Sequence, residues 1–184
     1  MRNVGGESRK TYAKKLSNGF FLQYMYRNGL DIGFSGYEPD VVPILGGAIG
    51  VDKDYPGYDG KTLPFSDGSQ QYVYSSHCLE HISDYKQAIR EWHRVTEVGG
   101  YIITVVPHRD LYEKQLNLPS RWNQDHKRYY TPASLLKEFE DSLPVNSFRV
   151  RHLQDNDKGH DYNTPFDEHS HGEYEIELVI QKIK

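Results

Sequence analysis

The stretch Gly29-Leu30-Asp31-Ile32-Gly33 decides the fold, because it is a short apolar run that ends in a glycine-rich turn. Such a run predicts a buried strand. Ala48-Ile49-Gly50-Val51-Asp52 has the same form and ends in an acid, and the aromatic alternation of residues 71–76 predicts a third strand. In open parallel sheets, ligands bind beyond the carboxyl ends of the strands. Gly33 and Asp52 are therefore candidate binding residues.

Helical segments alternate with these strands. Residues 84–98 carry apolar groups at helical spacing, and we expect Gly99-Gly100 to end that helix. Thr131-Pro132 combines an N-cap residue with proline at the first helical position, which predicts a helix running to about residue 141.

The remaining segments complete an α/β pattern. Residues 101–106 form a β-branched strand, and residues 145–153 and 174–183 predict a final strand pair. Residues 7–27 have helical spacing, which Gly19 weakens in the middle. We therefore expect an α/β fold whose sheet is mostly parallel, with an antiparallel last strand.

Composition narrows the class of protein. The chain has 184 residues, enough for one domain, and a net charge of −4, which gives no basic field for nucleic acid. Its single cysteine, Cys78, excludes an internal disulfide. No run approaches the roughly 20 apolar residues of a membrane span, and the basic start is not followed by a signal-peptide core. We expect a cytoplasmic protein with no membrane span.

The residues at the strand ends suit a nucleoside-containing ligand. Glycine at position 33 lets a ligand approach the backbone, and Asp31 can hold an ammonium group or order the loop. Asp52, at the tip of the next strand, suits the two hydroxyls of a ribose. A dinucleotide site would need a small residue where Tyr37 stands, which disfavours an NAD enzyme.

Further motifs follow in a fixed order. They are Leu63-Pro64-Phe65-Ser66-Asp67, Leu79-Glu80-His81-Ile82, and Glu91-Trp92-His93-Arg94-Val95 before Gly99-Gly100. From about Gly29 to Pro107, this order resembles the Rossmann-fold (class I) S-adenosylmethionine-dependent methyltransferases, in the small-molecule and sugar branch found with bacterial surface-polysaccharide genes. The resemblance implies a Rossmann-like methyltransferase sheet and S-adenosylmethionine as the cofactor.

The resemblance also implies a set of cofactor contacts. The glycine turn would face the methionine part, Asp52 the ribose, Lys53 the adenine, and the backbone after the third strand the methionyl ammonium and the methyl group. The turn departs from the family at Tyr37, and the short segment 53–58 implies a trimmed nucleotide-binding half whose edge strand is vestigial or absent. The implied cofactor-binding residues are Asp31, Gly33, Phe34, Ser35, Asp52, Lys53, Asp59, Gly60, Ser76 and His77.

The acceptor is expected to be a sugar or glycan hydroxyl. A hydroxyl nucleophile needs a base, and histidine titrates near neutral pH. The candidates are His108, His126 and His81, each of which has the alternative role of bonding a loop. The phrase from Val106 to Glu113 resembles polysaccharide-associated methyltransferases. Two alternatives stay open: N-methylation of a small amine, and a non-catalytic S-adenosylmethionine-binding protein.

Two sequence features raise the question of a metal. His77-Cys78-Leu79-Glu80-His81 matches the H-x-x-E-H zinc-protease pattern, but the strand that precedes it should keep His77 out of a helix. The loop 155–172 is rich in acids and histidines, and some sugar methyltransferases hold a divalent ion in this way. We predict no metal site in either place.

One domain, residues 1–184, accounts for the whole pattern. Within it we expect a helical N-terminal lid at 1–28, with packing as an extra core helix as the alternative. The cofactor-binding core should occupy 29–107, and acceptor loops with the terminal strand pair should occupy 108–184.

Overall fold

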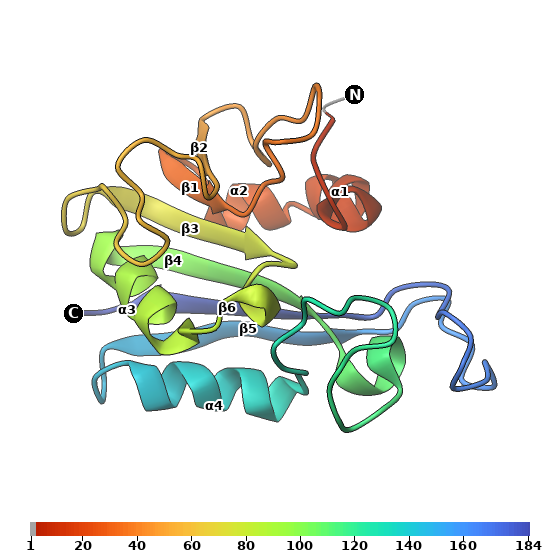
Figure 1. Cartoon of the computed structure of the whole chain (residues 1–184). Coiled ribbons are helices and arrows are strands. Elements are labelled where there is room, and N and C mark those ends of the chain that lie inside the picture. The colour runs from red at the N-terminus through yellow and green to blue at the C-terminus, as the bar shows by residue number, and fades with distance from the viewer. Residues whose placement is uncertain (1–2) are drawn as a thin grey trace.

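The computed structural model describes residues 3–184, which form one six-stranded sheet with helices on both faces (Figure 1). The order across the sheet is β2-β1-β3-β4-β6-β5. The strands are β1 (Gly29–Ile32), β2 (Ala48–Val51), β3 (Gln70–Ser76), β4 (Thr96–Pro107), β5 (Phe148–Asn156) and β6 (Glu175–Lys182).

Strand direction confirms the predicted fold class. The strands β1 to β4 pair in parallel, and β6 is antiparallel to both β4 and β5. The sheet ends at β2, and residues 52–69 contain neither helix nor strand, so this half of the sheet is trimmed as expected. Residues 33–47, which connect β1 to β2, also lack a helix. Long loops therefore surround the carboxyl ends of β1 and β2.

Two apolar clusters hold the layers together. On one face, α3 (Tyr85–Val95) and α4 (Pro132–Ser142) bury side chains such as Trp92 and Phe139 against the sheet. On the other face lie α1 (Ser8–Ser17) and α2 (Phe20–Tyr24), whose aromatic residues pack with Tyr72 of β3. Gly19 separates these two helices with a φ of +78°, which explains the weak point in the predicted helix.

The boundary between α3 and β4 corrects one expectation. The helix begins after Asp84, whose carboxylate accepts a hydrogen bond from the backbone of Gln87, but it ends at Val95 rather than at Gly99-Gly100. The two glycines lie inside β4. A Cβ atom on Gly100 would stand 2.4 Å from the carbonyl oxygen of Gln71, so glycine permits the close approach of β4 to β3.

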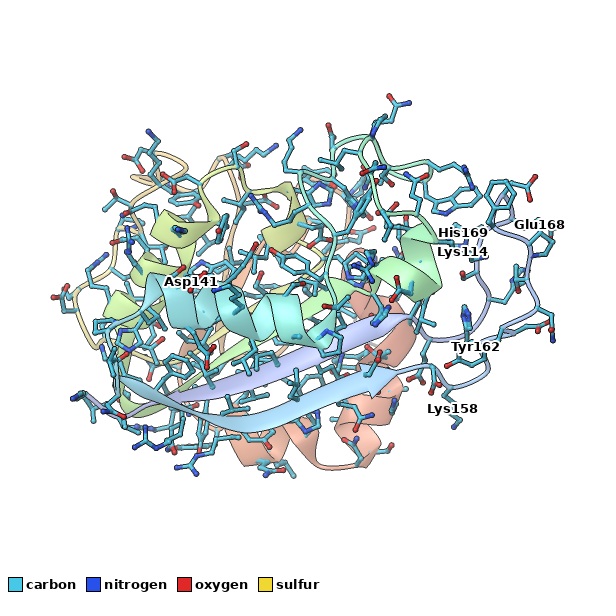
Figure 2. The ribbon with its side chains drawn as sticks, turned by 90° about the horizontal axis from the view of Figure 1, so that it is seen from below. Lys114, Asp141, Lys158, Tyr162, Glu168 and His169 are labelled. Carbon is cyan, nitrogen blue, oxygen red and sulfur yellow. The ribbon has the colours of Figure 1, made fainter. Side chains whose placement is uncertain are left out.

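The helix α4 begins at Pro132 as predicted, and the predicted final strand pair is present, although β5 starts at Phe148 rather than at residue 145. Thr131 accepts a hydrogen bond from the backbone of Ser134 and completes a capping box ahead of Pro132. The long connection between β5 and β6 extends beyond the sheet edge where Pro107 pairs with Glu175 (Figures 1 and 2). Lys114 reaches this connection and donates to the carbonyl of Glu168 at 2.8 Å.

Within residues 3–184, the structure contains no helix with the length and apolar character needed to cross a membrane.

Candidate active site

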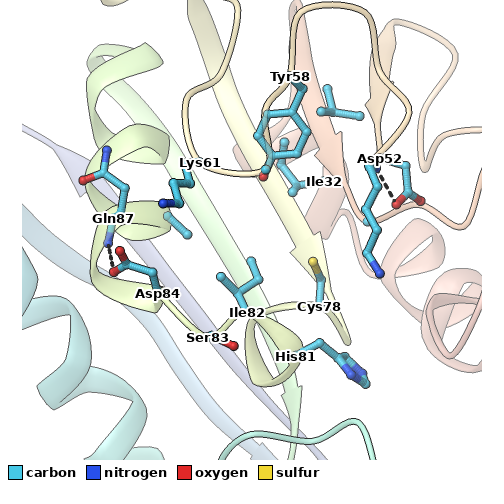
Figure 3. A pocket seen from close by; sticks show the side chains of 15 residues that line it. Ile32, Asp52, Tyr58, Lys61, Cys78, His81, Ile82, Ser83, Asp84 and Gln87 are labelled. Carbon is cyan, nitrogen blue, oxygen red and sulfur yellow. Dashed lines mark hydrogen bonds between the residues drawn. The ribbon is translucent and has the colours of Figure 1, made fainter.

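A mainly apolar cavity of about 430 Å³ lies at the carboxyl ends of β1, β2 and β3 (Figure 3). This size falls within the range of small-molecule sites. Figure 3 shows Ile32 beneath Tyr58, Ile82 below both of them, and Lys61 on the side toward α3. The lining residues are Ile32, Gly33, Val51, Asp52, Lys53, Tyr58, Gly60, Lys61, Cys78, His81, Ile82, Ser83, Asp84, Gln87 and Ala88.

A second cavity, polar and about 490 Å³, adjoins the first. The two share five lining residues: Gly33, Asp52, Lys53, Cys78 and His81. The polar cavity is also lined by residues from the start of the chain, the β1–β2 loop, the end of β3 and the loop before α4, which are Gly6, Glu7, Ser35, Tyr37, Glu38, His77, Asn123, Asp125 and Lys127. An apolar compartment and a polar compartment therefore meet at the strand ends.

Gly33 is required at the junction of the two cavities. Its φ is +73°, and a Cβ atom there would stand 2.6 Å from the sulfur of Cys78. Burial raises the pKa of the Cys78 thiol to about 12, so the thiol is neutral at physiological pH. The backbone at Gly33 is thus open to a ligand from one side and closed by Cys78 from the other.

Asp52 and Asp59 have different roles in the loops of this region. Asp52 follows β2 and lines both cavities, and one of its carboxylate oxygens accepts from the backbone of Lys53 at 2.9 Å. Asp59 instead accepts from the backbones of Lys61 and Thr62, which folds the turn that places Gly60 and Lys61 in the wall of the first cavity.

Three predicted contact residues lie behind the cavity walls. The carboxylate of the buried Asp31 accepts from the backbone of Ile44 at 2.6 Å, which orders the β1–β2 loop. The Phe34 ring occupies the space beside Gly36 and Gly50. Ser76 ends β3 as a buried residue. The lining of the two cavities includes none of these three, whereas Ser35 and His77 line the polar cavity.

The three candidate histidine bases occupy different environments. His81 lines both cavities, and burial lowers its pKa against the opposing effect of Glu80. His126 is buried beside it, with ring centroids 4.9 Å apart. His108 lies elsewhere: its Nδ1 accepts from the backbone of Asp110, and its Nε2 is 3.4 Å from a carboxylate oxygen of Asp155. His108 therefore stabilises the loop that follows β4, and it lines neither cavity.

The H-x-x-E-H motif does not form a zinc-protease helix. His77 follows β3 with a φ of +49°, and its Nε2 lies 3.1 Å from a Glu175 oxygen. Burial alone would lower the pKa of His77, but the hydrogen bond to Glu175 raises it overall. Only Leu79–His81 of the motif is helical, as a single 3-10 turn, η1.

Sequence reasoning missed several residues that shape the cavities. Tyr58, Asp84 and Gln87 line the apolar cavity, and Asn123 and Asp125 line the polar one. Asp84 had a usable signal, since it starts the first α-helix after the central strand and so lies near the ligand-binding edge of the sheet. Asn123 and Asp125 lie within residues 108–184, where acceptor loops were expected, although neither residue was predicted individually.

Comparison with known proteins agrees with this geometry. Residues 18–104 match the family model described as a methyltransferase domain. An uncharacterized methyltransferase from Mycobacterium sp. (strain KMS) is 36% identical over 86 residues, which are 46% of this chain and 33% of that protein. The chain thus spans about a third of the length of this curated relative.

Solved structures extend the fold match to nearly the whole chain. The Haloferax volcanii complex of the Trm112 methyltransferase activator and a putative methyltransferase matches with a TM-score of 0.63 at 15% identity, covering 96% of this chain and 92% of that chain. A SAM-dependent methyltransferase from Aquifex aeolicus matches with a TM-score of 0.58 at 13% identity, covering 96% and 94%. The fold is that of the class I methyltransferases.

Residues 18–104 match a methyltransferase domain, and the chain shares its fold with a structure described as a SAM-dependent methyltransferase, whose cofactor is S-adenosylmethionine. The cavities fit that cofactor, because an apolar compartment for a base adjoins a strand-end carboxylate, Asp52, and an exposed glycine backbone at Gly33.

Proposed function

We propose that the protein uses S-adenosylmethionine to methylate a hydroxyl group of a sugar or glycan. One observation carries the proposal: within the matched methyltransferase domain, an apolar and a polar cavity share Gly33, Asp52 and His81. In this proposal the apolar cavity holds the nucleoside of the cofactor, and the polar cavity holds its methionine end and the acceptor.

The cofactor supplies a methyl group on a positively charged sulfur. The chain's task is to hold and orient it. Asp52 is placed to accept hydrogen bonds from ribose hydroxyls, and Ile32, Tyr58 and Ile82 offer apolar surface to the adenine. The polar cavity is bordered by the backbone after Gly33 and by His77. We assign the methionine part of the cofactor to this cavity.

The polar cavity favours an acceptor rich in hydroxyl groups. Its wall presents carboxylates from Glu38 and Asp125, the amide of Asn123 and the phenol of Tyr37. Carboxylates accept hydrogen bonds from hydroxyls, amides both donate and accept, and an aromatic ring covers the apolar face of a sugar. Binding through several such groups would position one hydroxyl for in-line transfer.

His81 is the proposed base, because it is the candidate histidine that lines the cavities. Its lowered pKa keeps the imidazole neutral near pH 7, so it can accept the hydroxyl proton. The nearest Glu80 oxygen lies 3.7 Å from Nε2 of His81 and would stabilise the imidazolium that forms. His126 supports the ring of His81 from behind.

Cofactor binding tests the first part of the proposal. Calorimetry with S-adenosylhomocysteine should show binding to the full chain, and Asp52→Ala should weaken it by about tenfold to a hundredfold, the range for charge-assisted hydrogen bonds. Asp54→Ala is the matched control, because Asp54 is an exposed neighbouring acid that lines neither cavity. Binding that is absent, or unchanged in the Asp52 variant, contradicts the cofactor assignment.

Transfer of a labelled methyl group to a panel of sugars and amines tests the acceptor. His81→Asn should lower transfer to hydroxyls by about 10²- to 10⁴-fold and leave S-adenosylhomocysteine binding intact. His108→Asn, outside the cavities, is the control and should keep most of the turnover. Transfer confined to amines and insensitive to His81→Asn would instead establish N-methylation.

A further inference from the structure

A buried carboxylate without a hydrogen-bond partner lies next to His81, which lines the polar cavity. Glu80, in η1, is 0% exposed, and neither of its side-chain oxygens has a partner. Burying a carboxylate without hydrogen bonds is costly, and proteins usually pair such a group or use it to bind a metal ion. Its basic neighbours are the imidazoles of His77, His81 and His126, whose nearest nitrogens lie 3.9, 3.7 and 4.0 Å from Oε1, beyond hydrogen-bond distance.

Imidazole nitrogens surround one oxygen of this carboxylate. Nε2 of His81 is 3.7 Å and Nε2 of His126 is 4.0 Å from Oε1 of Glu80. Within residues 3–184, these three ligand atoms lie within 4.8 Å of one another. The bond lengths of a tetrahedral zinc ion separate its ligand atoms by about 3.3–3.5 Å, so small side-chain movements would bring all three into coordination.

Hydrogen bonds connect η1, which carries Glu80 and His81, to the segment that carries His126. The amide of Lys127 donates to the carbonyl of Glu80 at 2.8 Å. The Arg128 guanidinium donates to the carbonyls of Leu79, Ile82 and Ser83, at 2.8, 2.6 and 3.1 Å. These bonds attach segment 126–128 to η1. They hold the backbone of His126 beside Glu80 and His81.

His126 also has the outer partner typical of a metal-bound histidine. Its Nδ1 lies 2.5 Å from Oε1 of Glu113, and the other oxygen of Glu113 accepts from the hydroxyl of Ser120 at 2.7 Å. A carboxylate on Nδ1 fixes the tautomer that leaves the Nε2 lone pair free. This lone pair faces Glu80.

We propose that Glu80, His81 and His126 form a binding site for a divalent transition-metal ion of the zinc type, and that the ion blocks His81. Two imidazoles and one carboxylate are a ligand set that zinc accepts, with a fourth position left for water. Glu80 and His126 are buried, whereas His81 is 32% exposed in its side chain and lines the cavities, which gives the ion its entry path.

The regulatory consequence rests on the proposed function. A bound ion takes the lone pair that His81 would use to accept the acceptor's proton. Methyl transfer to a hydroxyl should therefore stop when the ion is bound, while the compartment around Asp52 stays free to bind the cofactor. The ion is an inhibitor in this scheme, and transfer does not require it.

Calorimetric titration of the full chain with Zn²⁺, without cofactor or acceptor, tests the site itself. We expect one ion per chain, and with Co²⁺ as the probe, a visible absorption band of a low-coordinate ion. Glu80→Gln and His126→Asn should each abolish this binding. Glu113→Gln, which removes only the outer partner, should weaken it by about 10- to 100-fold.

Controls separate coordination from loss of fold. His93→Asn removes a half-buried histidine whose Nε2 lies 3.5 Å from a backbone carbonyl, and Zn²⁺ binding should be unchanged. Circular dichroism and thermal melting identify variants that fail to fold, and Glu113→Gln provides the graded change. Absence of stoichiometric binding to the native chain, or equal binding by a folded Glu80→Gln variant, would overturn the site.

Two further measurements keep this proposal apart from the proposed function. S-adenosylhomocysteine should bind with the same affinity in the presence and absence of Zn²⁺, and its failure to bind at all would refute the methyltransferase without touching the metal site. With an active hydroxyl acceptor, saturating Zn²⁺ should lower turnover at least tenfold, and a chelator should restore it. Full turnover with the site loaded would refute the inhibitory role.

Discussion

Nζ of Lys15 in α1 lies 3.1 Å from Oε1 of Glu177 in β6, and the two side chains are only 2% and 6% exposed. Lys15 also lies 3.6 Å from Glu175 and donates to the hydroxyl of Thr11 at 2.8 Å. Burial alone would lower the pKa of Lys15, but Tyr74 and the two carboxylates raise it overall. This buried ion cluster fastens the N-terminal helix to the last strand.

Removing the cation of this cluster should destabilise the protein strongly. Lys15→Met removes the lysine charge between two buried carboxylates and leaves them only the imidazoles of His77 and His152, so we expect a loss of about 3–5 kcal/mol in the free energy of unfolding, measured with urea. Lys14→Met is the control. Lys14 pairs with Glu173 at the surface, 38% exposed, and its loss should cost at most about 1 kcal/mol. Equal effects of the two substitutions would contradict a special role for the buried cluster.

The same cluster should make the protein sensitive to acid. Burial alone would raise the pKa of Glu175, but the hydrogen bond to His77 and the charge of Lys15 lower it to about 2 from an ordinary value of 4.5. Because the folded pKa is depressed, the stabilisation is fully present above pH 4.5 and is lost as the pH falls toward 2.

Urea unfolding at a series of pH values between 5 and 2.5 would measure this effect. The free energy of unfolding should fall more steeply for the native chain than for Glu175→Gln, which has no carboxylate to protonate at that position. Parallel pH profiles for the two proteins would show that Glu175 does not supply this acid sensitivity.

Gly33→Ala should weaken ligand binding in the cavity proposed for the cofactor more than a comparable glycine substitution does. The new methyl group would meet the Cys78 sulfur at 2.6 Å in addition to the strain of a positive φ. We expect S-adenosylhomocysteine affinity to fall at least tenfold by calorimetry. Gly60→Ala imposes a similar φ, +82°, with no atom within 4 Å, so the difference between the variants isolates the clash. Equal affinities of the Gly33→Ala and Gly60→Ala variants for S-adenosylhomocysteine would show that the contact with Cys78 does not affect binding.

The start of α4 should depend on its cap. Thr131→Ala removes the acceptor for the backbone of Ser134, and caps of this kind contribute about 1 kcal/mol. Thr131→Ser keeps the hydroxyl and should restore most of that stability. A urea series on the three proteins would measure the order, and an alanine variant as stable as the native chain would show that the cap contributes nothing.

Local sequence signals were sufficient to predict most of the fold. Thr131-Pro132 marks the start of α4, and the apolar run before Gly33 marks β1, because capping and strand patterns depend on neighbouring residues. The end of α3 was predicted wrongly. Gly100 is glycine because β4 approaches β3 there, and a contact between strands distant in sequence leaves the same residue type as a helix stop.

The site was predictable where it depends on the strand ends and unpredictable where it depends on long connections. Gly33 and Asp52 follow β1 and β2, so topology alone places them at the cavities. Glu80, His126 and Glu113 meet only because segment 126–128 folds back onto η1. No periodicity or spacing in the sequence encodes that contact.

The two helix-free connections around the cofactor compartment, residues 33–47 and 52–69, affect how ligands bind. Loops have more conformational entropy to lose than helices, so part of the interaction energy with a cofactor goes into immobilising them. Binding should then slow amide hydrogen exchange in both loops far more than in β3 or β4. The smaller fold therefore has a consequence for binding: the affinity for the cofactor should depend on how much entropy these two loops lose when they become ordered.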